Sequence, residues 1–558
     1  MIEGKRDMLS IVFLTAAVEP GPRAAPFGAA RVASALDAAP DLAGRIRVSI
    51  VEGLAGDEPA ALAAKAAALR PDLLGLSLYS WNSGLLGAAA AIVRRSRPGV
   101  LVIAGGPDAS ADPERWARDG GADVAIAGEG EEAMIGIVRA MLRGDAAPGP
   151  VIRAPLLDPA SLSSPWLDGT LDASRWGGAA LELTRGCPYR CAFCFESKGA
   201  ARLRRFPLEI AGRELARFEE AGVEEVFVLD PTFNADSRRM AESLRLFAER
   251  GPNLRYLLEL RAELLTAEQA RLLSTVDCSV QIGLQSADPA VMETMDRKFD
   301  PDLFARKIRL LDEEGAIFGL DLIYGLPGDT LPGFKRSLDY ALSLGPNHLD
   351  VFRLAVLPGT ALYERASGLG LERDMAAPYL VRSAPGFGPE DLAEAERLAS
   401  STDVLYTKGR AVMWFRPVAV LAKARPSTLV ARFADYLDAA APGARAAGVP
   451  HRRLEELQLG FLSAMFEERP PKAPGAADAA LDLVRVSGAW TRALAEGETT
   501  EMDLGWTPDD VLDYATADIA EFAAEAPRAP GRWTCSPGPD GPRFRKTGAG
   551  RKGPGTRR

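Results

Sequence analysis

Histidine and cysteine are both rare in this sequence, which has two histidines and five cysteines among 558 residues. Five cysteines cannot build a disulfide framework in a chain of this length, so a reducing compartment is expected. The formal net charge of -10 lacks the basic excess that a general nucleic-acid-binding protein needs. No run approaches the roughly 18 consecutive apolar residues that a membrane span requires. These shortages favour a cytoplasmic protein that binds neither nucleic acid nor membrane.

The N-terminal apolar run LSIVFLTAAV (9–18) allows two interpretations. It follows Lys5 and Arg6 and could belong to a signal peptide. However, the run is short, and the residues after it offer no clear small-x-small cleavage site. A buried first strand of a cytoplasmic protein is therefore the preferred interpretation.

Residues 1–145 alternate short apolar runs with alanine-rich helical stretches. Such alternation is typical of a parallel sheet that helices cover on both faces. We therefore predict an α/β fold that begins with a Rossmann-like, doubly wound domain, whose ligands bind beyond the carboxyl ends of the strands. The predicted strands of this domain are 10–18, 46–53, 72–80, 99–106 and 122–128.

Residues 179–366 resume the alternation after a Pro- and Ser-rich segment, 146–178, which is predicted to be a linker. Six strand–helix units predict a partial (β/α)6 barrel of the TIM type, in which functional residues follow the strands. The cysteine-rich stretch CPYRCAFC (187–194) comes directly after the first of these strands. The predicted strands are 179–184, 225–230, 254–260, 278–284, 317–325 and 350–358.

Beyond the barrel, helical patterns dominate residues 367–525, which predicts an α-helical C-terminal domain. This domain could cap the barrel or be purely structural, and both interpretations stay open. Residues 526–558 are rich in Pro, Gly and basic side chains, a composition typical of a disordered tail. The tail could contact an anionic partner, but a solvated tail is the preferred interpretation.

Three of the five cysteines, Cys187, Cys191 and Cys194, have the spacing C-x3-C-x2-C. Thiolates at this spacing on one loop can converge on a single metal centre. A structural zinc site needs four protein ligands, and the remaining cysteines, Cys278 and Cys535, lie far along the chain, as do both histidines. A [4Fe–4S] cluster held by only three cysteines would leave one iron free to bind another ligand. A zinc loop with a distant fourth ligand is the alternative.

The CPYRCAFC segment, with Phe193 before its third cysteine, resembles the CxxxCxxC signature of radical S-adenosylmethionine (SAM) enzymes. The resemblance implies that Cys187, Cys191 and Cys194 hold a [4Fe–4S] cluster whose open iron binds SAM. It also implies that one electron from the cluster cleaves SAM to methionine and a 5′-deoxyadenosyl radical, which abstracts a substrate hydrogen atom.

Segments after the later barrel strands follow the order of the SAM contacts in this family. The family often has a glycine-rich segment ending in Glu after the second strand, where this chain has VLDPTFNAD (228–236), a pattern similar to that of cobalamin-carrying members. After the third strand, the polar side chains could hold SAM or form an ion pair at the strand end. The SAM contacts that the resemblance implies are Asp230, Thr232, Glu259, Arg261, Gln285 and Ser286.

Residues 1–145 are similar to the cobalamin-binding domain that precedes the barrel in one class of radical SAM enzymes. The loop after the first strand, TAAVEPGPRAAPFG, lacks the histidine with which many such domains bind cobalt, and no histidine precedes His348. The resemblance therefore implies cobalamin without a histidine ligand from this domain. A scaffold or substrate-binding domain without cobalamin is the alternative. The segments LSLYSWN, IAGGPDAS and AGEGEE supply the implied contacts Ser77, Gly105, Gly106, Gly128 and Glu129.

Together these resemblances predict a radical SAM enzyme, and more narrowly a cobalamin-dependent C-methyltransferase. One SAM would supply the methyl group through cobalt, and a second SAM would supply the radical. The expected partners are a small-molecule or natural-product substrate and a reductant such as flavodoxin or ferredoxin. A radical SAM enzyme that catalyses ring formation, rearrangement or oxidation is an alternative, with or without cobalamin. A metal-binding regulatory protein without turnover is an alternative from another class.

Overall fold

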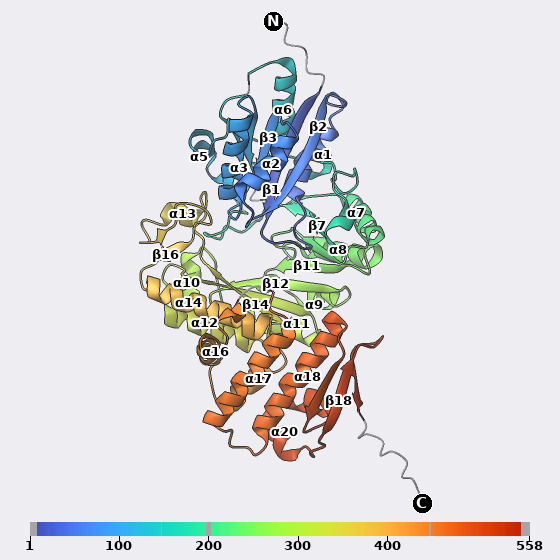
Figure 1. Ribbon diagram of the computed structural model, residues 1–558, viewed down its shortest axis with the longest axis vertical. Helices are drawn as coiled ribbons and strands as arrows, with labels where there is room; N and C mark the ends of the chain where they lie inside the picture. Colours follow the sequence, from blue (N-terminus) through green and yellow to red (C-terminus); the bar gives the residue numbers. More distant parts are fainter. Residues whose placement is uncertain (1–7, 147, 197–201, 446–447, 548–558) are drawn as a thin grey trace, which may run out of the picture.

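The computed structural model describes residues 8–146, 148–196, 202–445 and 448–547. Figure 1 shows three parts along the long axis of the molecule: a first α/β domain in blue, a central domain in green and yellow, and a C-terminal part in orange and red. The central and C-terminal parts share one continuous apolar core, whereas the first domain has separate cores on the two faces of its sheet. No helix in the described ranges is long and apolar enough to cross a bilayer.

The first domain contains a six-stranded parallel sheet with the order β2-β1-β3-β4-β5-β6. Successive residues of β1 point to opposite faces, so that Ile11 and Phe13 pack on one core, while Val12 and Leu14 pack on the other. The strand order confirms a doubly wound domain, with β1 and β3 side by side at the point where the order reverses. The strands are β1 (Leu9–Ala17), β2 (Ile46–Leu54), β3 (Leu73–Ser77), β4 (Leu101–Gly105), β5 (Val124–Ala127) and β6 (Val151–Arg153).

Helices cover both faces of this sheet (Figure 1). Helices α1 (Phe27–Asp37) and α6 (Gly130–Arg143) pack on one face, and α2 (Pro59–Ala68) and α3 (Ser83–Ser96) pack on the other. Their buried residues are mainly alanine and leucine, which allows close approach to the strands.

The segment 146–178, predicted to be a linker, contains more structure than a linker. Its first part forms β6, which extends the first sheet through pairing with β5. Trp166 is buried and donates a hydrogen bond from Nε1 to the carbonyl oxygen of Ala180 (2.9 Å). The Pro- and Ser-rich composition hid this anchoring, because a single buried tryptophan produces no periodic pattern.

The central domain is an open, six-stranded parallel sheet with the order β14-β13-β12-β11-β10-β7. Within the described residues β7 and β14 are the edge strands, which confirms a partial barrel. The predicted strands match the observed ones to within a few residues at each end. The strands are β7 (Gly178–Leu181), β10 (Glu225–Val228), β11 (Arg255–Leu260), β12 (Cys278–Gln285), β13 (Ile317–Tyr324) and β14 (His348–Arg353).

The C-terminal part is mainly helical, as predicted. Helix α14 (Pro389–Thr402) packs against β14 and α12 (Leu331–Ser343), while α17 (His451–Glu468) and α18 (Ala476–Glu496) pack against each other. This arrangement extends the apolar core of the barrel into the helical part.

The prediction of a disordered tail over 526–558 is wrong for the part of it that the structure describes. Strands β18 (Gly531–Ser536) and β19 (Arg543–Lys546) form an antiparallel sheet with β17 (Thr500–Leu504). Cys535 is fully buried, and the ring of Phe544 stacks on Trp490 at 5.7 Å between centroids. Backbone pairing with β17 stabilises this segment, whose Pro-, Gly- and Arg-rich composition is unfavourable for independent folding. Residues 548–558 of the predicted tail lie outside the described residues.

Candidate functional site

The three clustered cysteines lie on the loop after β7, which begins with the short strand β8 (Thr184–Arg185). All three thiols are unpaired; Cys187 is buried, and Cys191 and Cys194 are half-buried. The loop is anchored at Ala192, whose amide donates to the carbonyl of Met295 and whose carbonyl accepts from the amide of Leu362, both at 2.9 Å. The loop therefore sits at the carboxyl end of the barrel sheet, where barrels carry their functional groups.

Asp230 and Thr232 follow β10 and support this loop. The buried carboxylate of Asp230 accepts hydrogen bonds from the amides of Leu183 (3.0 Å) and Thr184 (2.9 Å). Burial raises the pKa of Asp230 to about 6, although these hydrogen bonds partly offset the effect. The Thr232 hydroxyl lies 3.8 Å from the sulfur of Cys187. Both side chains are thus brought to the cysteine loop, and a direct contact with SAM stays a prediction.

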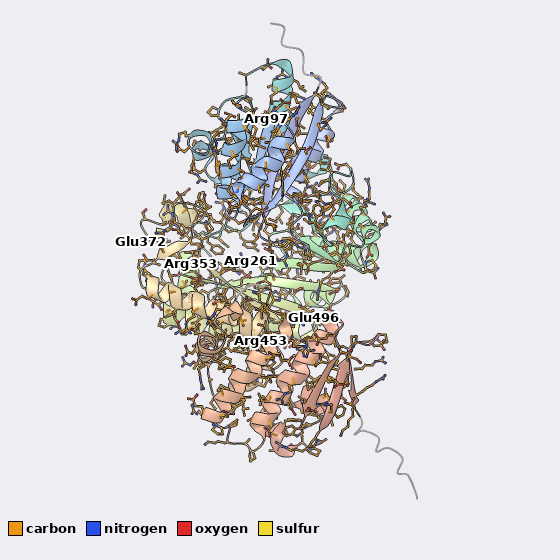
Figure 2. All side chains as sticks on the ribbon, viewed as in Figure 1. Arg97, Arg261, Arg353, Glu372, Arg453 and Glu496 are labelled. Atoms are coloured by element: carbon orange, nitrogen blue, oxygen red, sulfur yellow. The ribbon has the colours of Figure 1, made fainter. Side chains whose placement is uncertain are left out.

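Arg261 follows β11 and reaches the cysteine loop near the centre of the molecule (Figure 2). Its guanidinium donates to the sulfur of Cys191 (3.7 Å), pairs with Glu263 (3.0 Å from Nε) and lies 3.9 Å over the Tyr189 ring. Arg261 thus places a positive charge beside the sulfur of Cys191. The predicted ion pair at the strand end therefore exists, but Glu263 forms it rather than Glu259.

Glu259 alternates along β11 with the buried residues Leu258 and Leu260, so it lies on the opposite face of the sheet, where the residue is exposed. Protein groups nevertheless surround the carboxylate. This partial burial, together with the charge of Glu196, raises the pKa of Glu259 to about 7. The prediction that it holds SAM is not tested by these contacts.

Gln285 and Ser286, predicted to contact SAM after β12, have different surroundings. The Gln285 side-chain oxygen is buried without a hydrogen-bond partner in the described part of the chain. Ser286 is fully buried, lies 3.3 Å from the Ser337 hydroxyl and accepts a hydrogen bond from the Asp288 amide. Ser286 is thus committed to the protein, whereas Gln285 retains a free acceptor.

Arg297 is a member of this site that the sequence did not reveal. It is buried, donates from Nη2 to the carbonyl of Gly283 (2.6 Å) and lies 3.8 Å from Glu263, while its Nε has no partner among the described residues. It follows a short helix between two barrel strands, and no motif surrounds it. Only the folded chain brings it beside Arg261 and Gln285.

A cavity of about 960 Å³ lies between the first domain and the barrel. The five first-domain residues predicted as cofactor contacts all line it: Ser77, Gly105, Gly106, Gly128 and Glu129. From the barrel side, the cysteine loop contributes Gly186, Phe195 and Glu196. At Gly106, with φ of 96°, an added Cβ would lie 2.6 Å from the carbonyl oxygen of Leu78, so glycine is required at this wall.

The carboxylate of Glu129 is occupied by protein rather than free for a ligand. It accepts from Arg204 (3.0 Å from Nη1) and from the amide of Leu157 (2.7 Å), and it lies 3.5 Å from Arg185. These partners belong to the barrel and to the segment that precedes it. The predicted contact of Glu129 with a cofactor stays a prediction, and the structure assigns it an additional role in joining the domains.

Arg185, next to Gly186 and Cys187, also links the cysteine loop to the first domain. It pairs with Glu182 and with the buried Glu131, both at 2.8 Å. Burial opposes its charge, but the neighbouring carboxylates outweigh this and raise the pKa of Arg185. The adjacency of Arg185 to the cysteine motif was the one signal in the sequence that could have identified it.

Aromatic side chains form another part of the cavity wall. Tyr79 and Trp81 stack at 4.4 Å between centroids, and Trp81 donates from Nε1 to the carbonyl of Ala16 (3.0 Å). The loop after β1 contributes Pro22 to Phe27 to the same wall. Neither histidine of the chain is among the described residues that line the cavity.

Comparisons with known proteins match both domains. Residues 15–138 match the model of the B12 binding domain, and residues 181–341 match the radical SAM superfamily. The chain is 29% identical over 375 residues to the cobalamin-dependent radical SAM methyltransferase TokK of Streptomyces tokunonensis, covering 60% of this chain and 54% of TokK. It is also 29% identical over 379 residues to a 2-(S-pantetheinyl)-carbapenam-3-carboxylate methyltransferase of Streptantibioticus cattleyicolor, again covering 60% and 54%. The chain thus spans about half the length of these curated relatives.

Solved structures share the fold at low sequence identity. The cobalamin-dependent SAM radical enzyme OxsB with aqua-cobalamin bound has a TM-score of 0.57 at 13% identity, covering 93% of this chain and 85% of OxsB. The methyltransferase TsrM of Kitasatospora setae, with tryptophan and a SAM analogue bound, has a TM-score of 0.56 at 18% identity, covering 69% and 88%. These structures show a shared fold, while the two family models place a B12 binding domain at residues 15–138 before a radical SAM domain at residues 181–341.

Proposed function

We propose that this protein is a cobalamin-dependent radical SAM methyltransferase that adds a methyl group to a carbon atom of a small molecule. The observation that carries the proposal is the shared cavity. Glycine-rich turns of the first domain and the cysteine loop of the barrel line one continuous space. Two cofactors bound by these elements would therefore face the same substrate.

The donor types on the cysteine loop suit a [4Fe–4S] cluster, in which each thiolate binds its own iron, although no three such side chains of the described residues converge on a single ion. Cys187, Cys191 and Cys194 offer three unpaired thiols on one loop, and Arg261 places a positive charge beside Cys191. When bound, the cluster would coordinate SAM and supply the electron that cleaves it to methionine and a 5′-deoxyadenosyl radical. The free acceptor of Gln285 and the buried cation of Arg297 offer polar partners for SAM at the same end of the barrel.

The cavity wall of the first domain fits cobalamin. The volume of the cavity lies at the upper end of the range that is usual for small-molecule sites. Gly105, Gly106 and Gly128 allow the backbone to approach a bulky ligand, and Tyr79 and Trp81 offer a flat apolar surface. When bound, cobalamin would receive a methyl group from SAM and pass it to the substrate. Glu129 and Arg185 would act indirectly by holding the two domains together.

Methyl transfer is favoured over ring formation or rearrangement because the two curated relatives described above carry methyltransferase names. We further propose a small-molecule substrate, in line with the tryptophan bound to the fold relative TsrM. A flavodoxin or ferredoxin would deliver the electron. We also propose that the protein is cytoplasmic.

The proposal is tested by anaerobic reconstitution with iron, sulfide and cobalamin, followed by addition of SAM and a low-potential reductant. We expect both 5′-deoxyadenosine and S-adenosylhomocysteine, measured by liquid chromatography and mass spectrometry. Formation of 5′-deoxyadenosine alone would contradict methyl transfer and support another radical outcome. A fully loaded cluster that cleaves no SAM would exclude both enzyme functions.

A further inference from the structure

A buried hydrogen-bond network joins the first domain to the segment that follows the barrel. Tyr379 lies between β15 (Glu372–Arg373) and β16 (Val381–Ser383), and its hydroxyl donates to Oδ1 of Asp108 at 2.6 Å. Arg115 donates both to the Tyr379 hydroxyl and to Oδ2 of Asp108, each at 2.9 Å. The contact therefore joins residues of two domains that are far apart in the sequence.

Three members of this network are well shielded from water, while the side chain of Arg115 is 32% exposed. Tyr379 is 2% exposed, and Asp108 and Trp116 are each 5% exposed. Trp116 adds a further hydrogen bond from Nε1 to Oδ2 of Asp108 at 3.1 Å. A buried carboxylate is costly unless hydrogen bonds compensate it, so loss of one donor weakens the whole contact. Burial and the Asp108 carboxylate raise the pKa of Tyr379, which keeps its hydroxyl a donor.

Asp108 belongs to a wall of the cofactor cavity. It lies in the short helix α4 (Pro107–Ala111), and Gly106, Pro107, Ser110 and Ala111 all line the cavity. The Ser110 amide donates to the carbonyl of Gly106 (2.9 Å), and the Ser110 hydroxyl accepts from the amide of Gly128 (3.0 Å). A shift of Asp108 would therefore move two of the turns that face the cavity.

Tyr379 is tied equally firmly to the barrel. Its carbonyl accepts from the amide of Val356 (2.9 Å), in the loop that follows β14. The same loop carries Gly359, where an added Cβ would lie 3.2 Å from the Cα of Ala111 and 3.1 Å from the ring of Phe195. The loop thus touches both α4 and the cysteine loop, and Tyr379 connects it to Asp108.

We propose that Tyr379 is a positioning residue, which fixes the distance between the α4 wall and the barrel and so preorganises the cavity for cobalamin. The part that concerns cobalamin rests on the function proposed above, whereas the positioning of α4 does not. Without the hydroxyl, the first domain would sample arrangements in which the wall is displaced. Apparent affinity for cobalamin would fall in proportion to the fraction of protein that remains competent.

The first test uses hydrogen exchange in the cofactor-free full chain. Tyr379→Phe keeps the ring but removes the hydroxyl, and we expect the amides of Ser110 and Gly128 to exchange about tenfold faster. The matched control is Tyr406→Phe, because Tyr406 is equally buried (1% exposed) and its hydroxyl donates to the carbonyl of Pro346, within the barrel and helical core. The control should leave both amides unchanged. Unchanged exchange in Tyr379→Phe would overturn the proposal.

A second variant guards against a folding defect in Tyr379→Phe. Asp108→Asn weakens the same contact from the other domain and should accelerate the same two amides. Because the two side chains act through one contact, the double variant should exchange no faster than the more affected single variant. Fully additive acceleration would contradict a shared contact.

The second test measures equilibrium binding of cobalamin by its visible absorbance. We expect about tenfold weaker binding in Tyr379→Phe and binding within twofold of the wild type in Tyr406→Phe. Equal affinity in Tyr379→Phe and the wild type would overturn the link to cobalamin. If the wild type bound no cobalamin while the exchange change persisted, the proposed function would fail and the positioning role would stand.

Discussion

Individual side chains around the cysteine loop divide into the proposed cluster ligands and the groups that support the loop. Cys187, Cys191 and Cys194 present unpaired sulfurs, whereas Asp230 accepts from the amide of Leu183 and Arg261 donates to the sulfur of Cys191. The other two cysteines have purely structural surroundings. Cys278 is buried in β12, and its thiol donates to the carbonyl of Leu273 at 3.4 Å. This division leads to different expectations for substitutions of chemically identical residues.

Replacement of Cys187, Cys191 or Cys194 by Ala should abolish both the cluster and SAM cleavage, because each thiolate would bind a different iron. Iron and sulfide content and 5′-deoxyadenosine formation measure the two effects. Cys278→Ala and Cys535→Ala are the controls and should retain cluster content within measurement error. Loss of the cluster in Cys278→Ala would show that a fourth cysteine participates, contrary to the open-iron arrangement.

Residue-level prediction from the sequence succeeded where chemistry and spacing coincide within a few residues. The glycines that line the cavity were found this way, and the role of the three cysteines as cluster ligands stays a prediction. Arg297 and the pair of Tyr379 and Asp108 could not be found, because their partners come from distant parts of the chain and carry no local pattern. Ser286 shows the converse limit, since a position typical of a ligand contact is occupied by hydrogen bonds within the protein.

Strands β12 to β14 carry a hydrogen-bonded polar cluster on one face of the barrel sheet. Gln281 donates to Asp321 (2.5 Å) and to Asp350 (3.2 Å), and its oxygen lies 2.5 Å from Nε2 of His348. Burial, followed by the charges of Asp350 and Glu259, raises the pKa of Asp321 to about 7, although the Gln281 amide partly offsets this.

Asp321→Asn should change the pH dependence of stability. The folded protein binds the Asp321 proton more tightly than the unfolded chain, so this group stabilises the fold fully below about pH 4 and loses that contribution as pH rises through about 7. Asn cannot ionise, and its oxygen can still accept from Gln281. Between about pH 5.5 and pH 8, the free energy of unfolding of the variant should therefore rise by about 1 kcal/mol relative to that of the wild type. This is less than the full pKa shift implies, because water reaches the side chain.

Urea denaturation of the cofactor-free protein at the two pH values measures this gain. Asp236→Asn is a suitable comparison, because Asp236 caps α8 (Ser237–Arg250) and is not part of the polar cluster. Its effect should be similar at both pH values. A constant difference between Asp321→Asn and the wild type would show that Asp321 is already ionised in the folded protein.

Hydrophobic periodicity predicted the strands of both large sheets except β6, and it did not predict β18 and β19. The latter are short, contain several charged residues and depend on pairing with β17, so their own sequence carries little strand signal.

Phe544→Ala should lower the free energy of unfolding by about 1–2 kcal/mol, since the half-buried ring packs on Trp490. Arg545→Ala, at an exposed neighbouring position, should cost less than about 0.5 kcal/mol. Equal, negligible effects in thermal or urea unfolding would favour the tail predicted from composition.

The arrangement of the two domains completes the cavity, because each domain alone lines only part of it. Topology predicts that ligands bind beyond the carboxyl ends of the strands in both domains, and this much followed from the sequence. It did not follow that the two ends would face each other across one cavity. That placement depends on Arg185 with Glu131 and on Tyr379 with Asp108, contacts that form only when both domains have folded.

The same placement predicts that no histidine of this protein binds cobalt. Residues 22–27 of the first loop, which line the cavity, are PRAAPF. His348 lies in β14 against Gln281, and His451 in α17 lies 3.3 Å from the carbonyl oxygen of Gly409 and 3.2 Å from Arg492. Both are therefore held by the protein at positions outside the cavity lining. Bound cobalamin should show no coupling of cobalt to a histidine nitrogen.

Electron paramagnetic resonance of the protein loaded with cob(II)alamin tests this prediction directly. Spectra from protein labelled with 15N-histidine should match those from unlabelled protein, and His348→Ala and His451→Ala should bind cobalamin within twofold of the wild type. A spectrum that changes with the label would require a histidine to reach the cavity. Since both imidazoles are tied to the barrel and the helical part, such a change would demand a rearrangement of the domains, which the exchange of the Ser110 and Gly128 amides would also report.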